Sequence, residues 1–119
     1  MRAKGLLDTQ GSGNWISRDL VKRAGLQDKV SLVTDNKTFI DSQGSRYKPE
    51  HHIELTWYPN RSTTTRVTDF LISDGGPFDV LFGKEFLEDE RKNVAKPVLS
   101  IFTDKRTNSK QLDSLVIKN

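Results

Sequence analysis

Residues 5–17 read GLLDTQGSGNWIS, and this stretch decides the fold more than any other part of the chain. A short apolar run ends at Asp8, and a cluster of turn-forming residues follows it. Apolar runs bounded by glycine, serine and asparagine are typical of strands that feed tight loops. We therefore expect a strand that delivers the Asp8 carboxylate to a glycine-rich loop. An aspartate in this position can also serve only to cap a turn.

A short helix is predicted directly after this loop. Ser17 can cap its N-terminus, and Gly25 supplies the left-handed residue that ends it. Ile16, Leu20 and Val21 fall on one face of the helix, which indicates the side that packs against a core.

The following segments have the pattern of short strands. Ile53, Leu55 and Trp57 alternate with more polar residues, as in a strand with one buried face. Further strands are expected at 30–34, 38–40, 64–72 and 78–83, a hairpin tip at 41–46 and two helical turns at 84–91. The prediction is a mainly β domain of short strands with one or two short helices.

Composition restricts the class of protein. The chain has 119 residues, of which 34% are hydrophobic and none is cysteine. This is one small domain with a thin core, and a partner subunit would help to stabilise it. Without cysteine there are no disulfides, thiolate metal sites or cysteine nucleophiles, and the sequence fits a reducing compartment.

The charge pattern argues against a nucleic-acid partner. The net charge is +3, from 19 basic and 16 acidic side chains that are mixed along the whole chain. Binding of nucleic acid requires basic side chains concentrated on one face, so a basic nucleic-acid binder has only the high pI in its favour. No segment approaches the ~18 apolar residues of a membrane span, and no apolar run resembles a signal peptide. We expect an intracellular, cytoplasmic protein without a membrane partner.

A second motif lies about 70 residues after Asp8. Residues 78–87 read FDVLFGKEFL, an apolar strand followed by a glycine and a short helix. Together the two motifs resemble the retropepsin family of aspartic proteases, in which a hydrophobic-hydrophobic-Asp-Thr/Ser-Gly loop carries the catalytic aspartate and a later apolar-apolar-Gly strand packs beneath it. The similarity is to the retropepsin-like domains of fungal genomes and retrotransposon polyproteins, whose Asn-Trp-Ile-Ser and Leu-Val-x-Arg segments look like residues 14–17 and 20–23. It covers about residues 4–88.

The resemblance implies a closed β-barrel-like subunit that acts as a homodimer, with one aspartate from each chain in a shared site. It implies proteolysis, namely hydrolysis of peptide or protein substrates through an aspartate dyad and an activated water. Asp8 would be the dyad residue, and the Thr9 hydroxyl would grip the loop of the opposite subunit. The resemblance implies no cofactor and no metal.

One departure from the family pattern lies inside the loop. Gln10 stands where the family has glycine, and Gly11 and Ser12 follow it. Trp15 and Ile16 keep the family's distance from Asp8, so we interpret Gln10 as a substitution and not as an insertion. Two hypotheses follow: an active aspartic endopeptidase, or a catalytically inactive relative that serves dimerisation or peptide binding.

The resemblance also divides the chain. Residues 1–92 correspond to the retropepsin-like domain, and the domain's usual first strand is expected to be missing because only seven residues precede Asp8. Residues 93–119 form a C-terminal extension, either extra strands or a partly ordered tail.

Three other residues or pairs attract attention. Gly44 is either the tip of the hairpin that covers substrate in this family, its flap, or part of an ordinary surface hairpin. His51 and His52 are adjacent on a strand and point to opposite faces, so they do not predict a metal site. Asp79 lacks a following Thr-Gly and is expected to be structural.

Overall fold

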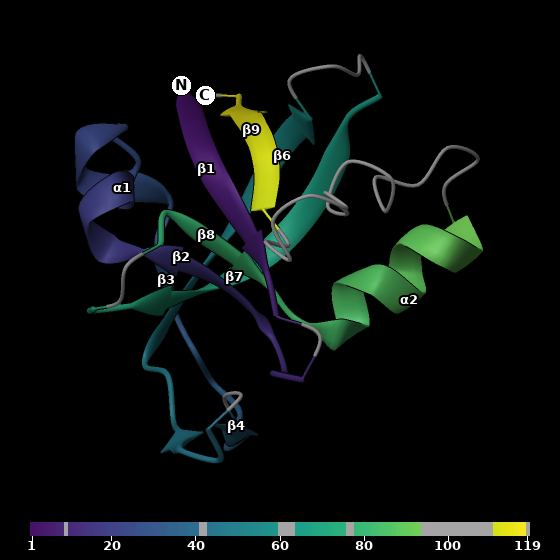
Figure 1. Ribbon diagram of the computed structural model, residues 1–119. Helices are drawn as coiled ribbons and strands as arrows, with labels where there is room; N and C mark the ends of the chain where they lie inside the picture. The colour runs from purple at the N-terminus through teal and green to yellow at the C-terminus, as the bar shows by residue number, and fades with distance from the viewer. Residues whose placement is uncertain (9, 41–42, 60–63, 76–77, 94–110, 119) are drawn as a thin grey trace.

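The computed structural model describes residues 1–8, 10–40, 43–59, 64–75, 78–93 and 111–118. Its centre is a closed six-stranded barrel with the strand order β6, β7, β2, β8, β1 and β9, and β9 returns to β6 (Figure 1). These strands are β1 (Arg2–Leu7), β2 (Asn14–Ser17), β6 (His51–Pro59), β7 (Arg66–Ser73), β8 (Val80–Phe82) and β9 (Gln111–Ile117). The predicted mainly β fold with a closed barrel is confirmed.

Shorter elements surround the barrel. They are β3 (Ser31–Leu32), which pairs with β6, the hairpin of β4 (Phe39–Ile40) and β5 (Arg46–Tyr47), the 3-10 helix η1 (Gln27–Lys29), and the helices α1 (Arg18–Arg23) and α2 (Lys84–Asn93). The predicted cap of α1 is confirmed, because Ser17 Oγ accepts the Leu20 N–H at 3.0 Å. Gly25 follows α1 in the left-handed region, with φ of 69°.

Strand β8 lies between β1 and β2 and separates them. It runs parallel to β1, with Leu81 opposite Leu6, and antiparallel to β2, with Leu81 opposite Trp15. The chain between β1 and β2 therefore cannot form a tight hairpin and instead passes over the end of β8. Asp8 and residues 10–13 are the described part of this crossing, and we call them the Asp8 loop.

The C-terminal strand completes the barrel. β9 pairs with β1 and with β6, and the chain termini lie side by side (Figure 1). The Met1 carbonyl accepts the Ile117 N–H at 2.8 Å, and the Met1 ammonium group donates to the Ile117 carbonyl at 3.1 Å. Of the two forms expected for residues 93–119, an added strand is the one present at Gln111–Ile117. The apolar segment at 98–102 lies outside the described residues.

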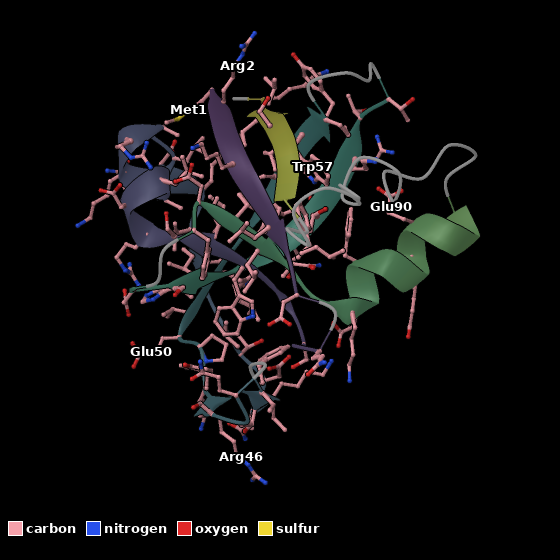
Figure 2. All side chains as sticks on the ribbon, viewed as in Figure 1. Met1, Arg2, Arg46, Glu50, Trp57 and Glu90 are labelled. Carbon is pink, nitrogen blue, oxygen red and sulfur yellow. The ribbon has the colours of Figure 1, made fainter. Side chains whose placement is uncertain are left out.

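An aromatic stack occupies the core beneath the start of α2. The rings of Phe82 and Phe86 are 4.2 Å apart between centroids, and that of Trp57 lies 4.9 Å from Phe82. Trp57 is completely buried within the barrel (Figure 2). Ile53 and Leu55 are also buried, as the alternation in β6 predicted. Rings of this size supply a large part of the hydrophobic stabilisation that a small core needs.

A buried ion pair joins α2 to the barrel. Arg66 Nε donates to Glu90 Oε1 at 2.8 Å, and the two side chains are 8% and 2% exposed. The Arg66 guanidinium also lies 5.9 Å from the Trp57 ring. In the described part of the chain, the second carboxylate oxygen of Glu90 has no hydrogen-bond partner. The pair is consequently costly to break, because the remaining charge would stay in the interior without the opposite charge of this pair.

Candidate active site

Asp8 is the first residue after β1, at the end of the barrel opposite the chain termini (Figure 1). Its backbone N–H donates to the Phe82 carbonyl at 2.8 Å, so β8 fixes the point where the loop begins. Its carboxylate is half-buried, and Oδ1 accepts two backbone N–H groups, from Gln10 at 3.1 Å and from Gly11 at 3.0 Å. Two such donors hold a carboxylate in one orientation.

Gly11 gives the carboxylate the space that it occupies. A Cβ atom at this position would collide with Asp8 Oδ2 and would lie 2.9 Å from Asp8 Cγ. Real Cβ atoms do not approach so closely, so any larger residue would displace the carboxylate. The position of the loop that requires glycine is therefore one residue after Gln10, which stands at the family's glycine position. Gln10 keeps only the N–H contact, and its side chain is exposed.

The turn between β8 and α2 packs against the backbone of the Asp8 loop. A Cβ atom on Gly83 would collide with the Gly13 carbonyl oxygen and would lie 2.9 Å from the Gly11 carbonyl oxygen. Backbone atoms cannot move aside as a flexible side chain can, so a glycine is needed for the two chain segments to touch. The predicted apolar strand and glycine of the second motif therefore lie directly under the loop that carries Asp8.

Three hydrogen bonds connect the Asp8 loop and Asn14, the first residue of β2, to this turn and to the start of α2. The Gly83 N–H donates to Asn14 Oδ1 at 3.1 Å, and the Lys84 N–H donates to the Gly11 carbonyl at 3.0 Å. The Gly13 N–H donates to Glu85 Oε2 at 3.0 Å. Sequence reasoning assigned no role to Asn14 or Glu85. Glu85 lies in the first turn of α2, where acidic side chains commonly interact with the positive end of the helix dipole. Its position in the sequence therefore did not indicate a contact with the Asp8 loop.

The structure places the predicted site residues of the Asp8 loop in different surroundings. Asp8, Gln10 and Gly11 lie together as expected. Thr9 lies outside the described residues, so its proposed grip on a partner loop stays a prediction. Ser12 contacts the β4–β5 hairpin and not Asp8, through hydrogen bonds of 3.1 Å in both directions with Ile40.

The hairpin expected around Gly44 exists and lies at the same end of the barrel as the Asp8 loop (Figure 1). Gly44 has φ of 84°, a conformation that favours glycine. The Arg46 side chain, on β5 opposite Ile40, points away from the barrel (Figure 2). Residues 41–42 of the expected tip lie outside the described residues.

Asp79 has structural contacts. Its carboxylate pairs with Arg23 at 3.0 Å and accepts the Lys4 N–H at 3.1 Å. Lys4 lies in β1 four residues before Asp8, so these contacts are made further back along β1, away from the Asp8 loop.

The adjacent histidines diverge, as expected for neighbours on a strand. His52 Nδ1 lies 2.8 Å from Asp69, and His51 Nδ1 lies 3.4 Å from the Arg18 guanidinium. Among the residues that the structure describes, no group of three or more histidine, aspartate or glutamate side chains is arranged to hold a metal ion.

No protein-family model matches the chain, and a search of curated proteins finds no match. Neither helix in the described ranges is long and apolar enough to cross a membrane.

Proposed function

We propose that the chain is a retropepsin-like aspartic peptidase domain that hydrolyses peptide bonds as a homodimer. The observation that carries the proposal is the position of the Asp8 carboxylate. It stands at the end of the barrel, one of its oxygens accepts two backbone N–H groups, and its loop rests on the glycine turn after β8. Such an arrangement suits a carboxylate that must keep one orientation while protons move.

Hydrolysis by carboxylates requires a second acid group. Two carboxyl groups about 3 Å apart cannot both ionise, so they share one proton. The charged member removes a proton from a bound water, which attacks the peptide carbonyl carbon, and the protonated member donates its proton to the reacting substrate. When the tetrahedral intermediate collapses, the carbon–nitrogen bond breaks and the departing amine takes up a proton.

A second copy of the chain is the proposed source of that group. Within the described residues, no hydrogen bond joins Asp8 to another carboxylate, and Asp8 is half-exposed where a partner could approach. The fungal or retrotransposon type of domain belongs to the same proposal. A cytoplasmic location is also part of the proposal, because a sequence without cysteine fits a reducing compartment.

Peptide cleavage tests the proposal directly. The purified chain is incubated with a library of unstructured peptides between about pH 3 and pH 7, because a dyad that shares one proton works on the acid side of neutrality. We expect cleavage that a statine-type transition-state mimic inhibits, and a dimer in sedimentation equilibrium. A dimer that cleaves nothing over this range contradicts the peptidase proposal and favours the alternative below.

Gln10 motivates a second candidate function, a non-catalytic module for dimerisation or peptide binding. Its exposed side chain stands beside Asp8, where the family's glycine has none. Near a two-fold axis, two such side chains would crowd the space between the carboxylates. The scaffold would then retain its fold and its ability to bind an extended peptide while losing hydrolysis.

Two matched substitutions separate the candidates. We expect Gln10→Gly to change kcat/KM less than about ten-fold, because the N–H at position 10 is retained and Gly11 already makes the close approach. We expect Gly11→Ala to lower kcat/KM by about 100-fold, because its Cβ displaces the carboxylate and small displacements of reacting groups have effects of that size. Both variants are assayed with the same peptide, and circular dichroism monitors folding.

The opposite pattern contradicts the peptidase proposal. If the parent protein is inert and Gln10→Gly gains hydrolysis, Gln10 has abolished catalysis on an otherwise competent scaffold, and the second candidate is correct.

A further inference from the structure

Helix α2 begins beside the Asp8 loop and extends away from it (Figure 1). Its first turn provides two of the hydrogen bonds that hold the loop. The Lys84 N–H donates to the Gly11 carbonyl, and Glu85 Oε2 accepts the Gly13 N–H. Gly11 in turn donates to the Asp8 carboxylate. A shift or rotation of α2 would therefore move the backbone that orients Asp8.

Two buried side chains set the position of α2 on the barrel. Among the α2 side chains that the structure describes, Phe86 and Glu90 are the buried ones, and a spacing of four residues places them on one face of the helix. The Phe86 ring packs against Phe82 at 4.2 Å and Trp57 at 5.9 Å between centroids. Glu90, one turn further on, forms the buried ion pair with Arg66.

The ion pair constrains α2 more tightly than the rings do. Apolar contact has no preferred direction, so it permits small rotations of a helix, whereas a charge-assisted hydrogen bond has a defined length and angle. Arg66 is itself held by the barrel, because it lies opposite Trp57 in the β6–β7 ladder and its Nη1 donates to the Thr64 carbonyl at 2.6 Å. Glu90 therefore ties α2 to a fixed point.

Stability alone does not account for a charged pair at this place. Burial removes both groups from water, and apolar replacements of buried pairs are often neutral or stabilising. Glu90 Oε2 is also buried and lacks a hydrogen-bond partner among the described residues, which adds to the cost of the pair. A buried pair with such a cost has a function if it selects one arrangement of the elements that it joins.

We infer that Arg66 and Glu90 are positioning residues for Asp8. The pair fixes the rotation of α2 on the barrel, and the first turn of the helix transmits that rotation to the Asp8 loop. The path is short, because the five residues from Glu85 to Glu90 correspond to a rise of about 7.5 Å along the helix. This inference rests on the proposed peptidase function, since it is for the reaction that Asp8 must be oriented.

Two variants separate position from stability. Arg66→Met with Glu90→Leu removes both charges and puts apolar packing in place of the directed contact. Glu90→Gln keeps an oxygen that can accept the Arg66 N–H but removes the opposite charge. We measure kcat and KM with a fluorogenic peptide that has apolar residues on both sides of the cleaved bond, at a temperature where circular dichroism shows every variant folded. Urea unfolding reports stability, and amide hydrogen exchange of Gly13 reports its bond to Glu85.

The two variants are expected to give opposite patterns. The double variant should keep a urea midpoint close to that of the parent protein, since apolar replacement of a buried pair is often neutral. Its kcat should nevertheless fall about ten- to 100-fold with KM changed less than about two-fold, because a small misplacement of a reacting group has effects of that size. Exchange of the Gly13 amide should accelerate about ten-fold.

Glu90→Gln should lower the urea midpoint, because the Arg66 charge stays in the interior without the carboxylate. Its kcat and Gly13 exchange should stay within about two-fold of the parent values, because the hydrogen bond that directs α2 is retained. A pair with a purely structural role would not give this crossing, since activity would then follow stability.

Arg18→Met with Asp74→Leu is the matched control. It removes a more exposed ion pair, which joins α1 to the residue after β7, and should change neither kcat nor Gly13 exchange. Glu85→Ala tests the route through the helix. It should lower kcat in the parent protein but have a much smaller further effect in the double variant, because changes that act through one contact are not additive.

Each result decides the inference. If the double variant keeps the parental kcat, or if its Gly13 amide exchanges at the parental rate, the pair does not position Asp8, and the inference is overturned while the peptidase function stands. An equal loss of kcat in Glu90→Gln also overturns it. If the parent protein neither cleaves the peptide nor binds its statine analogue, the proposed function fails and the inference fails with it.

Arg66→Lys keeps the test decisive if the double variant does not fold. This substitution retains both charges but removes the planar guanidinium that gives the contact its direction. We expect the same fall in kcat and the same acceleration of Gly13 exchange, and parental values for both would overturn the inference.

Discussion

Replacement of Asp8 by asparagine is expected to lower kcat/KM for peptide cleavage by about 100- to 10,000-fold while leaving the barrel folded. An amide cannot remove a proton from water or share one with a partner carboxylate, and groups with that role contribute about 100- to 10,000-fold. The fold should survive because the oxygen of the introduced amide can still accept the N–H groups of Gln10 and Gly11. The measurements are steady-state cleavage of the fluorogenic peptide and thermal unfolding.

Asp79→Asn is the matched control for this substitution. It removes a carboxylate from the same small domain, but one that lies away from the Asp8 loop and forms a partly exposed pair with Arg23. We expect it to retain cleavage, with at most a small loss of stability, since exposed ion pairs contribute little. Comparable cleavage by Asp8→Asn and the parent protein would refute the assignment of Asp8 as the dyad residue.

The second large effect concerns stability, and it lies at the buried ion pair. We expect Glu90→Ala to lower the free energy of unfolding by about 3–5 kcal/mol, because Arg66 would keep its charge in the interior without the Glu90 carboxylate. Losses of that size take a large share of the roughly 5–15 kcal/mol typical of small domains. Urea titration followed by tryptophan fluorescence measures the change, and Trp57 lies close enough to Arg66 to report it.

Two further variants make this prediction decisive. Glu90→Gln retains a hydrogen-bond acceptor for Arg66 and keeps the prediction measurable if the alanine variant does not fold. The double variant Arg66→Met with Glu90→Leu removes both charges and should recover much of the stability, since apolar replacements of buried pairs are often neutral or stabilising. If Glu90→Ala costs less than about 1 kcal/mol, the pair is accessible to water and the prediction is wrong.

Local patterns in the sequence predicted a substantial part of the fold. Alternation at Ile53, Leu55 and Trp57 identified the buried face of β6, and Ser17 identified the start of α1. These features depend on residues close together in the chain, where side-chain period and backbone capping are visible without knowledge of the tertiary structure. The strand β2 at Asn14–Ser17 was missed, because its four residues merge with the helix pattern that follows.

The candidate site was predicted in outline and revised in detail. The two motifs around Asp8 and Gly83 lie together, although they are about 70 residues apart. Gln10 donates to the Asp8 carboxylate, and Gly11 is a second donor whose missing side chain leaves room for that carboxylate. Local sequence could not reveal this, because both residues donate to the same oxygen and only the path of the loop decides which Cα faces it.

The sequence by itself determined the mainly β class, the strand that ends at Asp8, the glycine strand that supports it and the position of the α1 cap. Each of these follows from short-range periodicity or from residues whose backbone preferences are strong. Only the tertiary structure decided that β9 closes the barrel against β1 and β6, that Ser12 pairs with Ile40, and that Arg66 meets Glu90 in the interior. These contacts join segments far apart in the chain, and their stability comes from shared burial and main-chain pairing, which no local pattern encodes.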